Sequence, residues 1–275
     1  MIPLHDDQPS ATAPRVTIGI IVACVLVFLW QLTNTGAAGE EIFYSYGLVP
    51  AVLFGEADLP PDLAVVAPWM TILTSMFMHG GIMHLGGNML YLWIFGNNVE
   101  DSMGHTRYVA FYVACGVAAA LAQAFQDPSS EVPMIGASGA IGGVLGAYIL
   151  LHPNARVLVI IPFGFILYPM RIPAWIVLGL WFVLQLVAGG TTPTEGGGTA
   201  YWAHIGGFLA GMVLVFVFKK RGVPVLNFRG PHLSVPPGYE NTRWDDRAPD
   251  RKEERGSPFR LDPNRKHFNP FDDKR

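Results

Sequence analysis

Residues 136–151 read GASGAIGGVLGAYILL, a stretch with one serine and no charged side chain. Gly142 and Gly146 follow Ser138 at intervals of about one helical turn, and small residues at this spacing let membrane helices touch backbone to backbone. A polar residue in an apolar membrane segment is costly and usually functional. The stretch therefore predicts a closely packed membrane helix that starts at Ser138.

This helix is short for a bilayer. Residues 138–151 would cover roughly 21 Å at the rise of an α-helix, whereas the hydrocarbon core is about 30 Å thick. If the inner end reaches the cytoplasmic surface, Ser138 lies roughly 10 Å below the outer surface. Irregular backbone at that depth is tolerated only beside protein or a water-filled cavity, and a hydrolase in a membrane needs such a cavity.

Five further apolar runs accompany residues 138–151. The chain is 51% hydrophobic and only 14% charged, whereas a soluble domain carries about 25% charged residues. We therefore expect an all-α polytopic membrane protein with six transmembrane helices. The other five runs are 16–32, 83–99, 108–125, 172–188 and 201–218.

Residues 157–168 are also apolar, but Pro162, Gly164 and Pro169 interrupt the segment and its end. We interpret it as an interfacial connection or an extension of the fifth helix. The first outer connection, 33–82, is long and contains aromatic residues such as Trp69. Because aromatic side chains favour the membrane–water interface, we expect this loop to lie there.

Cationic residues alternate between the connections in a way that defines the topology. No Lys or Arg occurs in 33–82, 126–137 or 189–200. With six spans, every cation before the C-terminal tail falls on one side, and the positive-inside rule makes that side cytoplasmic. Both termini are then cytoplasmic. The cations are Arg15, Arg107, Arg156, Arg171, Lys219, Lys220 and Arg221.

The chain divides into three parts. We expect residues 1–14 to be a cytoplasmic N-terminal tail, 15–220 a six-helix domain and 221–275 a disordered, charged cytoplasmic tail. Eleven of the 18 Lys and Arg residues lie beyond residue 221, and few aliphatic residues accompany them, so this tail cannot bury a core. The net charge of −3 comes from mixed signs and gives no indication of nucleic-acid binding.

Several other classes are disfavoured. The N-terminus lacks the basic region of a signal peptide. Cys24 and Cys115 lie inside apolar runs, which indicates buried small residues and neither a disulfide framework nor a zinc site. No internal repeat is evident, which argues against an inverted-repeat transporter.

Polar groups open three of the apolar runs, at positions that the predicted topology brings to one depth. His84 and Asn88 open the second run, Ser138 the fourth, and His204 lies near the start of the sixth. All three runs descend from the outer side. Ser138 and His204 are thus predicted to meet as nucleophile and general base.

Glycines are expected to bring the two helices together. Gly207 and Gly211 follow His204 at three and seven residues, and they match the glycine stripe after Ser138. A serine in GASG alone would be explained as incidental small-residue packing, but a histidine with its own glycine stripe makes that explanation weak. The packing glycines that we select are Gly136, Gly139, Gly142, Gly207 and Gly211.

His84 and Asn88 are four residues apart and face the same way. Their side-chain donors, with the Ser138 backbone N–H, suit a developing oxyanion, although a structural hydrogen bond between helices is the alternative. We interpret His79 as a scaffold residue. The acidic residues on the outer side lie in loops, so a Ser–His dyad is expected and not a triad.

The stretches MHGGIMHLGGNMLYLWIFGNNVED (78–101), GASGAIGG (136–143) and AHIGGFLAG (203–211) resemble the rhomboid protease family over roughly residues 15–220. The resemblance implies a six-helix bundle that hydrolyses peptide bonds of transmembrane protein substrates within the lipid bilayer, without cofactor or metal. It implies Ser138 and His204 as the dyad and His84 and Asn88 as the oxyanion hole. Glu100 matches a position that stabilises the first loop from beneath.

The chain departs from the family pattern at two places. Trp69 is followed by Met70 where members often have Trp-Arg, and Gly142 stands where some members carry an aromatic residue that stacks on the histidine. These departures affect loop anchoring and histidine orientation. The compact form, without a transit peptide, favours a bacterial cytoplasmic membrane.

Two alternatives remain. A catalytically inert rhomboid-like protein could bind membrane clients, but such relatives typically lose the serine or the histidine. A transporter or channel would place polar residues on both sides of the midplane, whereas here they cluster in the outer third. The physiological substrate cannot be read from the sequence.

Overall fold

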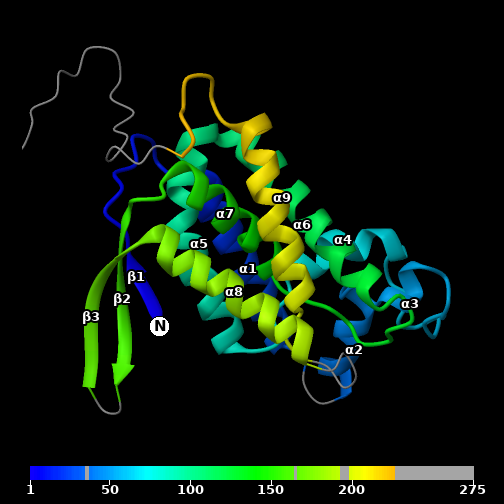
Figure 1. Ribbon diagram of the computed structural model, residues 1–275. Helices are drawn as coiled ribbons and strands as arrows, with labels where there is room; N and C mark the ends of the chain where they lie inside the picture. Colours follow the sequence, from blue (N-terminus) through cyan, green and yellow to red (C-terminus); the bar gives the residue numbers. More distant parts are fainter. Residues whose placement is uncertain (35–36, 164–165, 193–197, 227–275) are drawn as a thin grey trace, which may run out of the picture. The chain divides into compact units, whose positions relative to one another are not determined.

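The computed structural model describes residues 1–34, 37–163, 166–192 and 198–226, and most of this part is helical (Figure 1). The predicted tail beyond residue 226 lies outside the described residues. Each of the six apolar runs forms a helix. The helices are α1 Arg15–Leu32, α5 Ile82–Met103, α6 His105–Gln126, α7 Ser138–Leu151, α8 Ala174–Thr191 and α9 Tyr201–Phe218.

Four helices, α1, α6, α8 and α9, are long and apolar enough to cross a membrane by length and composition. The α7 helix is shorter, with 14 residues, as the sequence predicts. It is the most enclosed helix, buried along nearly its whole length, and it packs most extensively against α9, then against α6 and α5. The helix that begins at Ser138 therefore forms the centre of the bundle.

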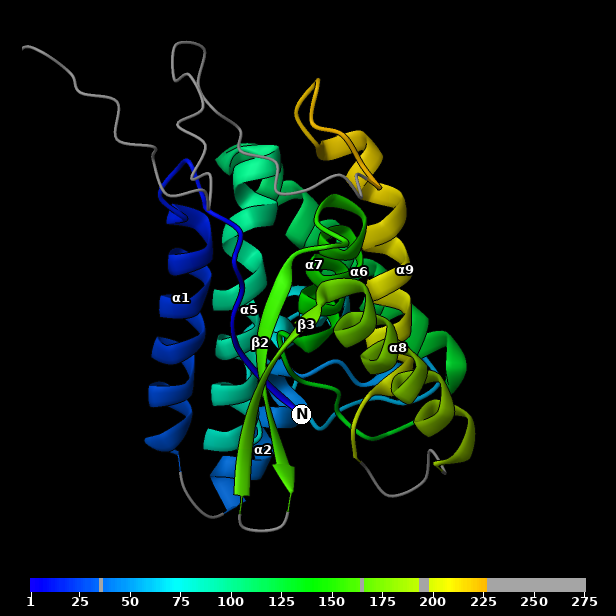
Figure 2. The same cartoon turned by 60° about the vertical axis from the view of Figure 1, so that its left-hand side comes forward.

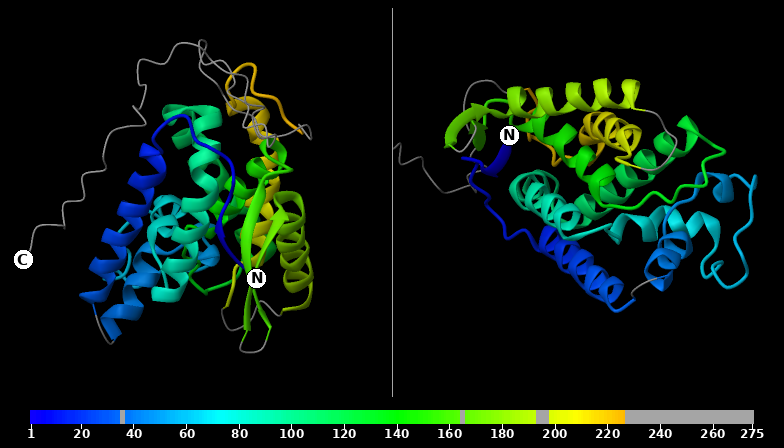
Figure 3. Two further views of the ribbon diagram at one scale, coloured as in Figure 1. Left: turned by 90° about the vertical axis from the view of Figure 1, so that its left-hand side faces the viewer. Right: turned by 90° about the horizontal axis from the view of Figure 1, so that it is seen from below.

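The expectation of an all-α fold is wrong, because a three-stranded antiparallel sheet in the order β1–β2–β3 is present. Its strands are β1 Ile2–His5, β2 Arg156–Phe163 and β3 Ile166–Pro173. The sheet lies along the side of the bundle between α5 and α8 (Figures 2 and 3). The described residues of 157–168 thus lie in strands and do not extend α8.

The local sequence explains the strands. Val157 and Val159 are fully buried, whereas Arg156 is exposed and Leu158 is only partly covered. This alternation follows the two-residue period of a strand. Pro162 and Pro169 exclude a continuous helix. The strands bury β-branched residues against the bundle, and a helix through these residues could not do so.

The N-terminal segment packs on the helical domain instead of extending away from it. Ile2 pairs with Ile160 in the sheet. Asp6, 3% exposed, accepts hydrogen bonds from the Tyr148 hydroxyl and, at 2.7 Å, from Asn98 Nδ2. Burial raises the pKa of Asp6, and the bonds from Tyr148 and Asn98 lower it in part. Residues 1–14, predicted as a tail, thus contribute an edge strand and a buried carboxyl group.

The first connection contains short helices that the sequence pattern did not reveal. Two of them are joined by a hydrogen bond from the Thr74 hydroxyl to the Tyr46 carbonyl. Just before α5, the His79 N–H donates to the Gln31 side chain of α1. Trp69 is 64% exposed, and its position at a membrane interface stays a prediction. The short helices are α2 Ala37–Tyr46, α3 Pro50–Leu53, η1 Pro68–Met70, α4 Thr71–Thr74 and η2 Ser75–Phe77.

Glu100 caps the start of α1 and does not contact the first loop through any of its hydrogen bonds in the described residues. Its fully buried carboxylate accepts from the Val16 N–H at 2.9 Å and from the Thr17 N–H and hydroxyl at 2.8 Å each. His105 Nδ1 lies 2.6 Å from the same carboxylate. The α1, α5 and α6 helices are thus tied together at the end away from Ser138.

We expect Glu100→Ala to lower the stability of the purified protein by about 2–4 kcal/mol, because two buried donors of Thr17 and the partly buried Val16 N–H lose their acceptor. Glu100→Gln should lose less, since its amide oxygen still accepts. Thermal unfolding in detergent measures the effect, and Glu131→Ala, which removes an exposed loop carboxylate, is the control. An unchanged melting temperature for Glu100→Ala would show that the cap is unimportant.

Candidate active site

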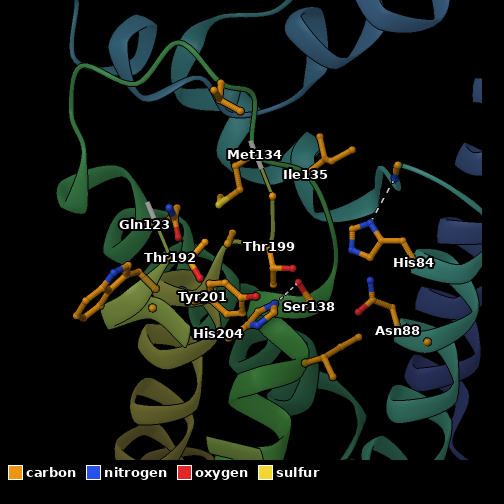
Figure 4. Close-up of a pocket in the computed structure, with 18 of the residues that line it drawn as sticks. His84, Asn88, Gln123, Met134, Ile135, Ser138, Thr192, Thr199, Tyr201 and His204 are labelled. Carbon is orange, nitrogen blue, oxygen red and sulfur yellow. Dashed lines mark hydrogen bonds between the residues drawn. The ribbon is translucent and has the colours of Figure 1, made fainter. Parts of the chain in front are cut away.

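Ser138 and His204 meet across the contact between α7 and α9. Ser138 is the first residue of α7, and His204 lies in the first turn of α9. The Ser138 Oγ and His204 Nε2 atoms are 2.8 Å apart, which is a hydrogen bond (Figure 4). Residues 66 positions apart in the chain therefore form a hydroxyl–imidazole pair.

Glycines allow this approach. A Cβ atom built on Gly207 would lie 1.9 Å from the Gly139 carbonyl oxygen, and one on Gly211 would lie 1.9 Å from the Gly143 carbonyl oxygen. A Cβ on Gly142 would lie 2.9 Å from the His204 carbonyl oxygen. The α7 and α9 backbones are therefore in direct contact, and any side chain at Gly207 or Gly211 would force them apart.

Gly136 shapes the turn before Ser138. Its φ of +128° is unfavourable for residues with a side chain, and its N–H donates to the Ser75 carbonyl at 2.9 Å. A Cβ built there would lie 2.9 Å from His84 Nε2 and 3.6 Å from Ser138 Oγ. Glycine thus lets the backbone run between the His84 ring and the serine.

His84 and Asn88 project from α5 on the other side of Ser138 from His204 (Figure 4). His84 Nδ1 accepts the Gly80 N–H at 3.3 Å, so a neutral ring carries its proton on Nε2, the atom near Gly136. Asn88 is 8% exposed, and its Nδ2 is a buried donor without a hydrogen-bond partner among the described residues. The His84 ring and the Asn88 amide, each of which carries an N–H group, thus lie on the side of Ser138 opposite His204.

A cavity of about 660 Å³ joins these groups. Ser138, His204, His84 and Asn88 all contribute to its wall, together with apolar side chains that include Ile141. The space is large enough for a chain segment of a few residues. The arrangement combines a hydroxyl, a base and unpaired donors beside one void, which is what acyl transfer requires.

His79 supports this wall from behind. It is 1% exposed, and its ring meets the His84 ring edge-on at 5.2 Å between centroids. Its Nδ1 lies 3.2 Å from the Phe77 carbonyl. Burial, with a smaller contribution from His84, lowers the pKa of His79 to about 4, so the ring is neutral at physiological pH. These contacts agree with the scaffold role expected for His79.

The α8 helix contributes two contacts to His204 that the sequence analysis missed. Trp181 lies against the imidazole, with centroids 5.8 Å apart, and Gln185 Oε1 lies 2.8 Å from His204 Nδ1. Gln185 is the single amide in an otherwise apolar helix, and a polar residue in such a helix could have indicated a contact with the site. Trp181 thus makes a ring contact with His204 of the kind that was expected from an aromatic residue at position 142.

Comparison with known proteins identifies the family. Residues 67–221 match the model of the rhomboid domain, which is more than half of the chain. The chain belongs to the rhomboid family. Its apolar helices and this membership make it a multi-pass membrane protein.

Similar curated proteins come from several kingdoms. The chain is 33% identical to RHOMBOID-like protein 5 of Arabidopsis thaliana over 62% of its own length and 49% of that protein. It is 30% identical to the mitochondrial Rhomboid protein 1 of Saccharomyces cerevisiae over 55% of its length and 42% of that protein. It is 31% identical to Rhomboid protease GluP of Bacillus subtilis over 52% of its length and 26% of that protein. The match thus spans about half or less of these relatives.

Proposed function

We propose that this protein is an intramembrane serine endopeptidase in which Ser138 is the nucleophile and His204 the general base. The observation that carries the proposal is the 2.8 Å contact between Ser138 Oγ and His204 Nε2 at the wall of a cavity. Family membership adds support, since rhomboid relatives include a named protease. Neither residue has been lost, as would be typical of an inert relative.

The reaction would proceed through an acyl-enzyme. The Ser138 hydroxyl passes its proton to His204 Nε2 as its oxygen bonds to the peptide carbonyl carbon. The C–N bond then breaks, and His204 returns the proton to the leaving amine. A water molecule next gives a proton to His204 Nε2 as its oxygen bonds to the acyl carbon of the ester. The bond between that carbon and Ser138 Oγ then breaks, and His204 returns the proton to Oγ, which releases the acid and restores the hydroxyl.

The tetrahedral intermediates need donors for their oxyanion, and we propose His84 Nε2, Asn88 Nδ2 and the Ser138 backbone N–H for this role. The unpaired Asn88 amide supports it, because a buried donor without a partner is costly unless a ligand uses it. The His84 tautomer fixed by Gly80 supports it further. Gly136 supports it as well, because its lack of a side chain lets the His84 ring lie close to the backbone before Ser138.

We expect Asn88→Ala to lower turnover about 10²–10³ fold, because removal of one oxyanion donor has an effect of this size. His84→Ala should also lower turnover, and KM should change little in both. Steady-state cleavage in detergent gives both constants. If neither variant changes turnover, the two side chains are structural.

The substrates that we propose are transmembrane segments of membrane proteins, cut without a cofactor, metal or nucleic acid. We place all six helices of the bundle, the short α7 included, in the membrane with both termini cytoplasmic, and the membrane would be a bacterial cytoplasmic one. The cationic ends support this topology: Arg107 donates to the Lys219 carbonyl at 3.4 Å, and Lys220 donates to the Asp101 carbonyl at 2.7 Å. Cations thus gather at the ends of α5, α6 and α9.

The decisive experiment uses purified full-length protein, a model transmembrane substrate and a fluorophosphonate probe. The wild-type protein should cleave the substrate and acquire one label on Ser138, as peptide mapping would show. An inert client-binding protein or a transporter would show neither. Absence of cleavage and labelling in a folded sample would overturn the proposal.

A further inference from the structure

The second nitrogen of the His204 ring has a partner of its own. His204 Nδ1 lies 2.8 Å from Gln185 Oε1, which projects from α8, nineteen residues earlier in the chain. No carboxylate forms a hydrogen bond with His204 among the described residues; its ring nitrogens contact only Ser138 and Gln185 there. The place that an acid takes in a Ser–His–Asp arrangement is therefore occupied by an amide.

The orientation of this amide follows from its other contact. Gln185 Nε2 donates to the Trp181 carbonyl at 3.3 Å, one turn earlier in the same helix. If the amide were flipped, its oxygen would face that carbonyl oxygen, and two acceptors would repel each other. The amide oxygen is therefore the atom that faces His204.

The proton on His204 follows in turn. An amide oxygen accepts and cannot donate, so His204 Nδ1 must be the donor in this contact. A neutral imidazole with its proton on Nδ1 has its lone pair on Nε2, the atom 2.8 Å from Ser138 Oγ. The hydrogen bond to Gln185 thus selects the only neutral tautomer that can take the serine proton.

The same helix also limits rotation of the ring. Trp181 lies one turn before Gln185 on α8, and its ring plane is inclined by 35° to that of His204 at a centroid distance of 5.8 Å. Trp181 packs on Phe208 of α9 as well, at 6.0 Å. One face of α8 therefore supplies both a ring that covers the imidazole and an acceptor that fixes its tautomer.

We propose that Gln185 is a positioning residue for His204, which it holds in the tautomer and orientation that accept the Ser138 proton. The inference rests on the proposed function. It adds Gln185 to the Ser138–His204 dyad as a third residue, which is hydrogen-bonded to His204 and takes no proton. Gln185 is neutral, so it orients the imidazole without adding charge. Its position on α8 makes the reactivity of the serine depend on where that helix lies.

The test compares Gln185→Met, which keeps length but removes the acceptor, with Gln185→Glu, which restores an acceptor oxygen. Leu184→Met, on the exposed side of the same helix, is the matched control. Two rates are measured for each folded variant: cleavage of a transmembrane substrate, with kcat and KM, and labelling of Ser138 by a small fluorophosphonate. The second rate needs no entry of a substrate helix.

Gln185→Met should lower kcat roughly 10- to 100-fold, since a hydrogen bond and the selection of a tautomer are lost. KM should stay within about threefold and labelling should slow in parallel, because the defect is in proton transfer and not in substrate binding. Gln185→Glu should be at least tenfold faster than Gln185→Met. Leu184→Met should match the wild-type protein in both rates.

Three results would overturn the inference. One is wild-type cleavage by Gln185→Met. Another is slower cleavage with unchanged labelling, which would assign Gln185 to substrate entry. The third is equal loss in the Met and Glu variants with equally lowered melting temperatures, which would indicate packing alone. If Gln185→Met does not fold, Gln185→Leu takes its place. Failure of the proposed function is separate, because the wild-type protein itself would then neither cleave nor label.

Discussion

Ser138→Ala and His204→Ala are each expected to lower cleavage of a transmembrane substrate by about 10⁴-fold or more, and the double variant should lose no more than either single one. The two side chains share one proton and one 2.8 Å contact, so removal of either disables the same step. Cleavage of a fluorogenic transmembrane substrate by purified protein measures the three rates.

Ser129→Ala is the control for the serine, because Ser129 is an exposed loop residue before the same helix. It should cleave at the wild-type rate. Ser138→Ala should keep the wild-type melting temperature, and His204→Ala should lower it, because the imidazole packs on Trp181 and its Nδ1 bonds to Gln185. If the two single losses multiply in the double variant, the residues act independently and the proposed pair is wrong.

Gly207→Ala is expected to abolish most activity without a change in any reacting atom. The new Cβ would lie 1.9 Å from the Gly139 carbonyl oxygen, so α7 and α9 must separate by roughly an ångström or more to relieve the clash. A misplacement of about 1 Å can lower a rate by about 10². Gly211→Ala, with the same clearance from Gly143, should act similarly.

Substitutions at two other glycines serve as a milder variant and as a control for this prediction. Gly142→Ala should be milder, because its Cβ would lie 2.9 Å from the His204 carbonyl oxygen and needs a smaller shift. Gly179→Ala on α8 should keep full activity, since nothing lies within 4 Å of its Cβ. Cleavage rate and melting temperature are measured together. A Gly207→Ala protein with wild-type values for both would show that helix contact does not bring Ser138 to His204.

The helices of the bundle were predictable because membrane insertion constrains local sequence. A run of apolar residues long enough for a bilayer must be helical to satisfy its backbone, so the positions of α1 and α9 follow from composition alone. The pairing of Ser138 with His204 was predictable too, since alternate spans descend from one side. This prediction required only the direction in which each helix crosses the membrane, and no knowledge of contacts between distant parts of the chain.

The sheet was not predictable in the same way. Ile2 pairs with Ile160, and the Tyr148 hydroxyl donates to Asp6. Hydrogen bonds between strands join residues far apart in sequence, and no local periodicity of residues 1–14 indicates them. Pro162 and Pro169 interrupt the apolar segment, which was interpreted as an interfacial connection or a helix extension, and no residue in it indicated which strand it would pair with.

The family, the helix positions, Ser138, His204 and the glycine stripes could be read from the residues, because each is a local pattern imposed by the membrane or by close helix contact. The side chains that complete the site depend on how the helices pack. Gln185 could have faced lipid from its helix; the rotation of α8 turns it to His204 Nδ1 and places Trp181 against the imidazole ring. The rotation of a helix about its axis depends on packing against its neighbours, and its own apolar residues, which surround α8 on most faces, do not specify it.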